Sequence, residues 1–272
     1  MVLDGVDWKQ AIARHAQTAD ERFVRTTLVR YRDLGYTYLR DGGDRWGAGA
    51  RARQLAPEYG ITYRTPLAPL VSAGHYGGFI GLQYESLESY VNLVGSHRAA
   101  GADFIKIMIS GLMDFDRYGV LTEEGLPPEQ IRELIHIAHE EGFSVMAHAN
   151  GARTVEAAAA AGVDSVEHGA YLDADALHAM REAGTVWVPT LSTVGNLLGK
   201  GRFCQEAVER ILADTTEKVA AFAGMGGLIA PGTDAGAWAV PHGSQTEIPW
   251  LLRAGVTEDA LALGAETIRR RF

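Results

Sequence analysis

Short apolar runs alternate with longer amphipathic segments along most of this chain. The apolar runs are rich in β-branched residues and short enough to be β-strands. Between them, apolar residues recur at the spacing of one helix face, and most of these segments end at a glycine. The pattern predicts strands within residues 36–43, 61–71, 103–110, 143–149, 164–170, 186–192 and 228–236. It predicts helices at 19–35, 128–142, 152–162, 173–184, 205–226 and, as a pair, 245–271.

This strand–helix alternation is typical of a parallel sheet, because each helix returns the chain to the same end of the sheet. About seven such units in 272 residues predict one α/β domain, a (β/α)8 barrel of the TIM type over residues 1–272. An open doubly wound sheet is the alternative, but no G-x-G-x-x-G motif follows an early strand. The pattern lacks the first strand of a complete barrel, and no segment indicates a separate β-sandwich domain.

One predicted strand, "ADFIKIMISG", contains a charged residue, Lys106. Side chains alternate along a strand, so Phe104, Lys106 and Met108 share one face and three isoleucines share the other. The isoleucine face is expected to pack against the outer helices, which points Lys106 into the barrel. Burial lowers the pKa of an amine, and a neutral amine can react with carbon dioxide to form a carbamate.

Three more polar residues lie where predicted strands end: His148, His168 and Asp234. In a barrel, the active site lies at the carboxyl ends of the strands. Neutral imidazoles are ligands of zinc and similar metals. Asp234 can bind a metal and accept a proton from a metal-bound water, whose pKa the metal lowers. These positions, together with Lys106, indicate a metal site.

Charge and cysteine content narrow the possible partners. The formal net charge is −9 and the basic residues form no long block, which disfavours nucleic acid and anionic membranes as partners. No apolar run is long enough for a membrane span, and the first residues do not resemble a secretory signal. The single cysteine, Cys204, fits a reducing compartment. We expect a cytoplasmic protein with a small-molecule substrate, and the oligomeric state stays open.

The segments "FIKIMISG", "VMAHANGARTVEAAAAAGVDSVEHGAYLD", "VPTL" and "APGTDAG" resemble the amidohydrolase superfamily. The similarity is to its imidazolonepropionase-like and Xaa-Pro or Xaa-Arg dipeptidase-like branch, and runs from about residue 20 to the end. It implies that Lys106 is a carboxylated lysine bridging two divalent metals, with zinc the expected ion. It also implies that His148 and His168 bind the second metal. Asp234 would bind the first metal and act as general base and acid.

Four residues are candidates for contact with a substrate. "AGHYGG" resembles the third-strand loop of the family, which makes His75 and Tyr76 candidates. Tyr171 follows His168 closely, and His242 lies in the loop after the last strand, on the side of the site.

The sequence departs from the family at one motif. An H-x-H pair normally ends the first strand and binds the first metal, but this sequence contains no H-x-H. A truncated reading frame, a single-metal variant and an inactive relative each explain this. Truncation is favoured because the missing motif coincides with the missing strand.

The leading hypothesis is a metal-dependent hydrolase that cleaves an amide-type C–N bond of a small molecule or dipeptide-like substrate. Metal-bound hydroxide would attack the carbonyl carbon, and Asp234 would carry the proton to the leaving nitrogen. The alternative is a non-catalytic or single-metal barrel that binds a ligand. An esterase or lactonase is a third possibility, because the same hydroxide attacks either carbonyl.

Overall fold

Two parallel sheets form the centre of the computed structural model, which describes all 272 residues. The smaller sheet pairs β1 (Tyr38–Arg40) with β2 (Thr62–Arg64). The larger sheet has seven strands in the order β4-β3-β5-β6-β7-β8-β9, and all its neighbours are parallel. Its strands are β3 (Leu70–Ser72), β4 (Leu82–Tyr84), β5 (Ile105–Met108), β6 (Val145–Ala149), β7 (Ser165–His168), β8 (Val186–Val188) and β9 (Leu228–Ile229).

Each predicted strand is present, with one subdivision. The run 61–71 forms both β2 and β3, because Pro66 and Pro69 between them have no N–H to donate to a ladder. β4 is an additional strand that pairs with β3.

The predicted helices are also present, each within a residue or two of its expected start. They are α2 (Glu21–Asp33), α5 (Pro128–Glu140), α6 (Ala152–Ala160), α7 (Ala174–Ala183), α9 (Gln205–Gly224), α10 (Glu247–Arg253) and α11 (Glu258–Arg271). Shorter or less amphipathic helices escaped prediction: α1 (Trp8–Arg14), α3 (Ala48–Leu55), α4 (Leu87–Ala99), α8 (Ser192–Gly195) and the 3₁₀ turn η1 (Ala56–Tyr59). No helix is both long and apolar enough to span a membrane.

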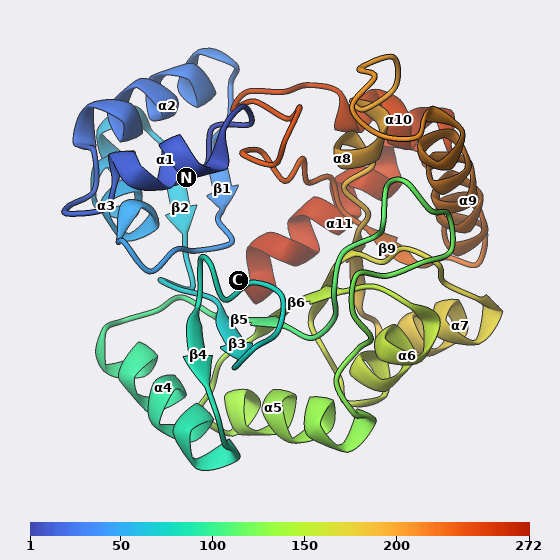
Figure 1. The fold of residues 1–272 in the computed structure, drawn as a ribbon, viewed down its shortest axis with the longest axis horizontal. Coiled ribbons are helices and arrows are strands. Elements are labelled where there is room, and N and C mark those ends of the chain that lie inside the picture. Colours follow the sequence, from blue (N-terminus) through green and yellow to red (C-terminus); the bar gives the residue numbers. More distant parts are fainter.

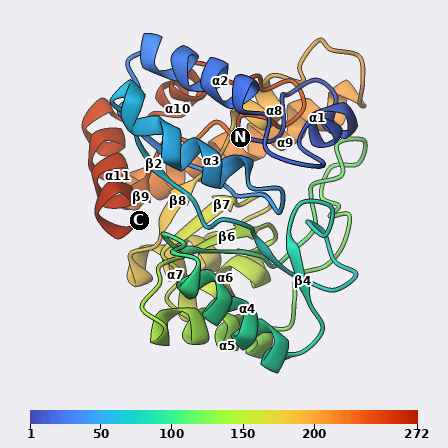
Figure 2. The same cartoon turned by 90° about the vertical axis from the view of Figure 1, so that its left-hand side faces the viewer.

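The helices surround the strands as in a barrel (Figure 1). Seen from the side, α2 and α10 lie on one side of the strands and α4 to α7 on the other (Figure 2). Helix α11 packs directly against β9, where a Cβ on Gly264 would collide with the carbonyl of Ile229. The fold is thus the predicted α/β barrel type.

The ring of strands is not closed. β1 pairs only with β2, β9 pairs only with β8, and no strand joins β1 to β9. The smaller sheet is attached to the larger one at Asp103, whose N–H donates to the carbonyl of Thr65 and whose carboxylate accepts the N–H of Thr65. The strands are therefore those of the expected barrel type, and the ring is open between β1 and β9.

The two faces of β5 pack into different hydrophobic clusters, as the alternation of side chains predicted. Ile105 and Ile107 are fully buried with the residues of α5 in the main core cluster. Phe104 belongs instead to a smaller cluster inside the barrel, with Met146 and Val188. Burial of one such side chain stabilises the fold by about 1.5–3 kcal/mol, so β5 is fixed with Lys106 on its inner face.

Candidate active site

Four strand ends bring the predicted polar residues to one place. Lys106 is on β5, His148 is on β6, His168 is the last residue of β7, and Asp234 follows β9. The register pairs Met108 with His148 and Ala149 with His168, so neighbouring strand ends are level.

Two cavities meet at these residues. The inner cavity, of about 410 Å³, lies among the strands and is lined by Tyr38, Arg40 and Glu167, among others. The mouth cavity, of about 850 Å³, lies among the loops and is lined by Tyr76, Phe203 and Trp238, among others. Lys106, His168 and Asp234 line both cavities, and His148 lines the mouth cavity. This arrangement leaves room for a ligand in contact with all four side chains.

Lys106 is buried without a hydrogen-bond or ion-pair partner for its amine. Burial lowers the pKa of Lys106 to about 8, although the negative charges of Glu167 and Asp234 oppose this shift. A substantial fraction of the amine is therefore neutral, and nucleophilic, slightly above neutral pH.

The rings of His148 and His168 pack edge to face, with centroids 4.7 Å apart and an angle of 63° between their planes. The Nε2 atom of His148 lies 3.1 Å from the carbonyl oxygen of Gly111, and Nδ1 of His168 lies 2.7 Å from Oγ1 of Thr190. Burial, and then the charge of Lys106, lowers the pKa of His168 to about 3. Burial also holds the pKa of His148 well below its usual value. Both rings are thus neutral at neutral pH.

Asp234 is exposed, and it lines both cavities. The surrounding protein raises the pKa of its carboxyl by desolvation, and Lys106 partly opposes this. Asp234 and His168 both have a positive φ, 51° and 70°, which is uncommon for residues other than glycine. Such conformations cost free energy and persist where surrounding contacts impose them, often at functional sites.

The donor set suits a divalent metal ion in part. Each histidine has one ring nitrogen engaged in a hydrogen bond, while the other makes none and is free to bind an ion. Neutral imidazole is a common ligand of zinc and related ions. No three His, Cys, Asp or Glu side chains converge closely enough to hold an ion by themselves. Two histidines therefore fit, and a complete set needs a further ligand such as a modified Lys106.

The two candidates from the third-strand loop lie differently. Tyr76 lines the mouth cavity, and its ring centroid is 4.9 Å from that of His148. His75 is exposed, lies 3.7 Å from Glu123 and lines neither cavity.

The other two candidates are held by protein contacts. Tyr171 packs against Tyr118 and lines neither cavity. His242 lines the inner cavity, but its ring nitrogens lie 3.0 Å from the hydroxyl of Tyr31 and 2.8 Å from the carbonyl of Leu3. Burial lowers the pKa of His242 to about 4.

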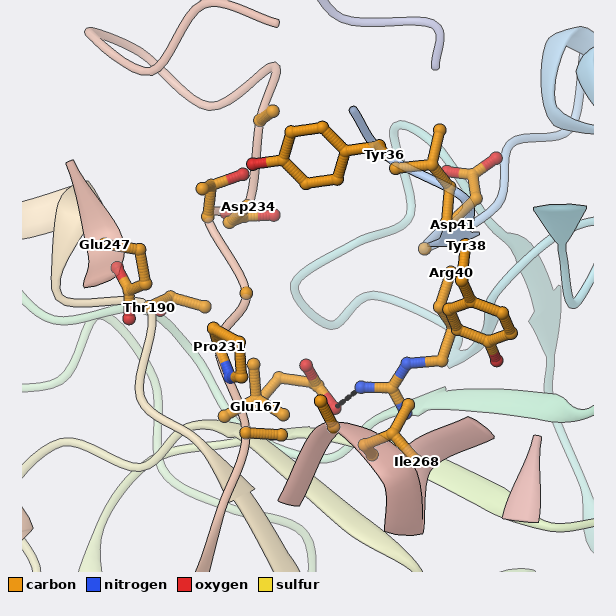
Figure 3. A pocket seen from close by; sticks show the side chains of 18 of the residues that line it. Tyr36, Tyr38, Arg40, Asp41, Glu167, Thr190, Pro231, Asp234, Glu247 and Ile268 are labelled. Carbon is orange, nitrogen blue, oxygen red and sulfur yellow. Dashed lines mark hydrogen bonds and ion pairs between the residues drawn. The ribbon is translucent and has the colours of Figure 1, made fainter. Parts of the chain in front are cut away.

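An ion pair that sequence analysis missed lies inside the barrel. Arg40 donates to Glu167 over 2.8 Å (Figure 3). Arg40 also donates to the hydroxyl of Ser165, which in turn donates to Glu167. The signal was available for Glu167, a charged residue in a buried strand just before His168. The contribution of Arg40 was not visible, because β1 and β7 are far apart in sequence.

Two further residues, Thr190 and Glu247, also escaped prediction. Both line the inner cavity on the side of Asp234 (Figure 3). Thr190 lies in the family-like segment "VPTL", to which the sequence analysis gave no role, and Glu247 belongs to no recognised motif.

Comparison with known proteins places the chain in a family. Residues 85–262, well over half of the chain, match the model of the amidohydrolase family. The chain therefore belongs to this family, as the sequence motifs predicted.

Individual relatives are more distant. The ochratoxinase of Aspergillus niger is 25% identical over 266 residues, which covers 84% of this chain and 53% of that protein. Its crystal structure superposes with a TM-score of 0.72 at 21% identity, covering 89% of this chain and 61% of that one. A Xaa-Pro dipeptidase with methionine bound in its active site superposes with a TM-score of 0.75 at 21% identity. The match covers 93% of this chain and 70% of the dipeptidase chain. These similarities show that the chain shares the fold of these two structures.

This chain spans about half the length of the curated ochratoxinase that it matches.

Proposed function

We propose that this protein hydrolyses an amide-type C–N bond of a small molecule or dipeptide-like substrate with the help of a divalent metal, zinc being the first candidate. One observation carries the proposal. Two neutral imidazoles, a buried amine of lowered pKa and a carboxyl of raised pKa meet at a cavity shared by four strand ends. Membership of the amidohydrolase family, and similarity to a Xaa-Pro dipeptidase and an ochratoxinase, support it.

His148 and His168 would hold the metal, which when bound supplies Lewis acidity and lowers the pKa of water. Lys106 would add a ligand after carbamate formation. Its neutral amine forms a bond to the carbon of carbon dioxide and releases one proton, leaving two carboxylate oxygens in place of a cation. The lowered pKa of Lys106 supports this reaction, because only the neutral amine has the necessary lone pair.

Asp234 would act as general base and then general acid. Its raised pKa suits a group that takes a proton from the attacking water and returns it to the leaving nitrogen. Tyr76 lies beside His148 in the mouth cavity and would contact the substrate. His242 would form part of the wall of the inner cavity next to the substrate. His75 and Tyr171 would need loop movement to reach a substrate in either cavity.

Replacement of Asp234 by Asn tests the proton-transfer role. Turnover on a panel of dipeptides and N-acyl amino acids should fall by about 10²–10⁴-fold, the usual contribution of general acid–base catalysis. The circular dichroism spectrum should not change. Asp173→Asn is a matched control, because Asp173 caps α7 away from the cavities. Equal turnover of Asp234→Asn and wild-type protein would refute the role.

A single-metal protein that binds a ligand without turnover is the second candidate, favoured by the lack of three converging acidic, histidine or cysteine ligands. Metal analysis separates the two. About two ions per chain with turnover supports the hydrolase, whereas one ion or none without turnover supports the binding protein. Matched esters in the panel test an esterase or lactonase.

A further inference from the structure

Thr190 has an unusual backbone conformation next to the candidate site. Its φ is 52°, in the left-handed region, where a β-branched residue is a genuine outlier. It is buried, and it lies in the loop after β8, two residues before the start of α8. Surrounding contacts must impose this conformation, because an isolated threonine would leave it.

Glu247 supplies the contacts that fix the chain just after Thr190. Its carboxylate comes from α10 and is almost fully buried. One oxygen accepts the N–H of Leu191 over 3.0 Å, and the other accepts the N–H of Ser192 over 2.7 Å. The neighbouring Thr246 hydroxyl also donates to the hydroxyl of Ser192. Both carboxylate oxygens are thus used to hold two consecutive backbone amides.

The side chain of Thr190 in turn contacts a histidine of the site. Its Oγ1 lies 2.7 Å from Nδ1 of His168, the only hydrogen bond to that ring. If Nδ1 carries the proton and donates it to Thr190, the lone pair of Nε2 faces the cavity. A hydrogen bond to one ring nitrogen is the usual way in which a protein fixes the tautomer and orientation of a metal-binding histidine.

We propose that Glu247 is a positioning residue that fixes Thr190 through the Leu191 and Ser192 amides, so that the Thr190 hydroxyl holds His168 as the Nδ1–H tautomer with Nε2 directed to the cavity. The functional part of this inference rests on the proposed metal-binding role of His168. The structural part does not, because it concerns contacts within the chain. Simple capping of α8 does not account for the arrangement, since it requires neither the left-handed Thr190 nor its contact with His168.

Nuclear magnetic resonance of the metal-free protein tests the structural part directly. Ring ¹⁵N shifts of His168, measured at pH 8 where the imidazole is neutral, should show one tautomer with the proton on Nδ1 in the wild-type protein. Glu247→Gln can accept only one of the two amides, and Thr190→Val has no hydroxyl. Both variants should therefore show a mixture of tautomers, and Thr190→Ser should restore the single form.

Zinc affinity, measured by competition with a chelating dye, tests the functional part. It should fall by about 10–100-fold in Glu247→Gln and Thr190→Val and recover in Thr190→Ser, as found for residues that orient metal-binding histidines. Asp164→Asn and Thr185→Val are matched controls. They remove a carboxylate bound to the N–H of Val145 and a hydroxyl bound to the carbonyl of Val163, both at the opposite strand ends.

The outcomes are distinct. An unchanged tautomer in either Thr190→Val or Glu247→Gln overturns the inference, as does a loss of zinc affinity equal to that of the controls. If Glu247→Gln fails to fold, Glu247→Asp takes its place, because the shorter side chain moves the carboxylate away from the two amides, while the Thr190 pair of variants tests the contact with His168. A wild-type protein that binds no zinc refutes the proposed function instead, while the tautomer shift in the variants would still support the role of Glu247.

Discussion

Removal of Arg40 should leave the carboxylate of Glu167 buried inside the barrel without its ion-pair partner. Arg40 and Glu167 form an ion pair 2.8 Å long, and their side chains are only 8% and 5% exposed. With methionine at position 40, the hydrogen bond from Ser165 remains for Glu167, and the ammonium of Lys106 gives only partial compensation. The guanidinium also lies over the ring of Phe272, with Cζ 4.4 Å from the ring centroid. Methionine keeps an apolar side chain of similar length at this position, so the lost interactions are chiefly electrostatic.

The size of the expected loss in the free energy of unfolding follows from the burial of the ion pair. Breaking a buried ion pair by removing one partner costs about 3–5 kcal/mol, whereas replacing both partners by apolar groups is often nearly neutral. We expect Arg40→Met to lower the free energy of unfolding by about 3–4 kcal/mol, with the Ser165 hydrogen bond keeping it at the lower end. In the double variant Arg40→Met/Glu167→Met the loss should shrink to about 1–2 kcal/mol.

Urea denaturation, followed by tryptophan fluorescence and circular dichroism, measures these differences, and Glu167→Met completes the double-mutant cycle. The exposed pair Arg98–Glu141 is the control, with side chains 63% and 39% exposed. Arg98→Met should change the stability by less than about 1 kcal/mol. A loss in Arg40→Met no larger than in Arg98→Met, or a double variant as unstable as the sum of its singles, would refute the reasoning.

Three further predictions concern the helix packing, acid stability and Lys106. Gly264→Ala should destabilise the protein by at least about 2 kcal/mol, because the new methyl group collides with the Ile229 carbonyl. Gly95→Ala in α4 has open space around it and should stabilise the protein by about 0.5–1 kcal/mol. Similar melting temperatures of the two variants would contradict this prediction. The pKa of His168 is about 3 in the folded protein and 6.5 in the unfolded chain. The contribution of the neutral His168 ring to the free energy of unfolding is therefore complete above pH 6.5 and is lost as the pH falls towards 3. From pH 7 to pH 5 this should cost about 2 kcal/mol in the metal-free protein, and the loss should be smaller in His168→Gln. Lys106→Met should abolish turnover. It should also raise the free energy of unfolding of the metal-free protein at pH 7 by on the order of 2–3 kcal/mol, because burial lowers the pKa of Lys106 from 10.5 to about 8. An unchanged or lower denaturation midpoint of the variant would contradict this prediction.

The fold was accessible from sequence where the local pattern is strong. Helices such as α5 and α9 have long amphipathic repeats, and strands such as β5 and β6 have buried faces on both sides, so periodicity and glycine ends located them. β4 has three residues with mixed exposure, and α8 has four fully buried residues, so neither has a periodic signal. Their form depends on their neighbours.

The same division applies to the candidate site. Strand alternation alone placed Lys106 inward, and the strand ends identified His148, His168 and Asp234, because side-chain direction in a strand is a local property. Whether His75, Tyr76, Tyr171 and His242 reach a cavity depends on loop conformations, which local sequence does not encode. The structure puts Tyr76 and His242 in cavity walls and leaves the other two outside.

The sequence by itself determined the strand–helix alternation, the family and the four polar residues at the strand ends, since each follows from local periodicity or a contiguous motif. Only the tertiary structure decided the shifts in the pKa values of these groups, the pairing of Arg40 with Glu167, and the connection from Glu247 through Thr190 to His168. These depend on burial and on contacts between segments more than 50 residues apart for Glu247 and more than 120 for Arg40. Desolvation and short-range hydrogen bonds act through space, so the order of residues along the chain does not reveal them.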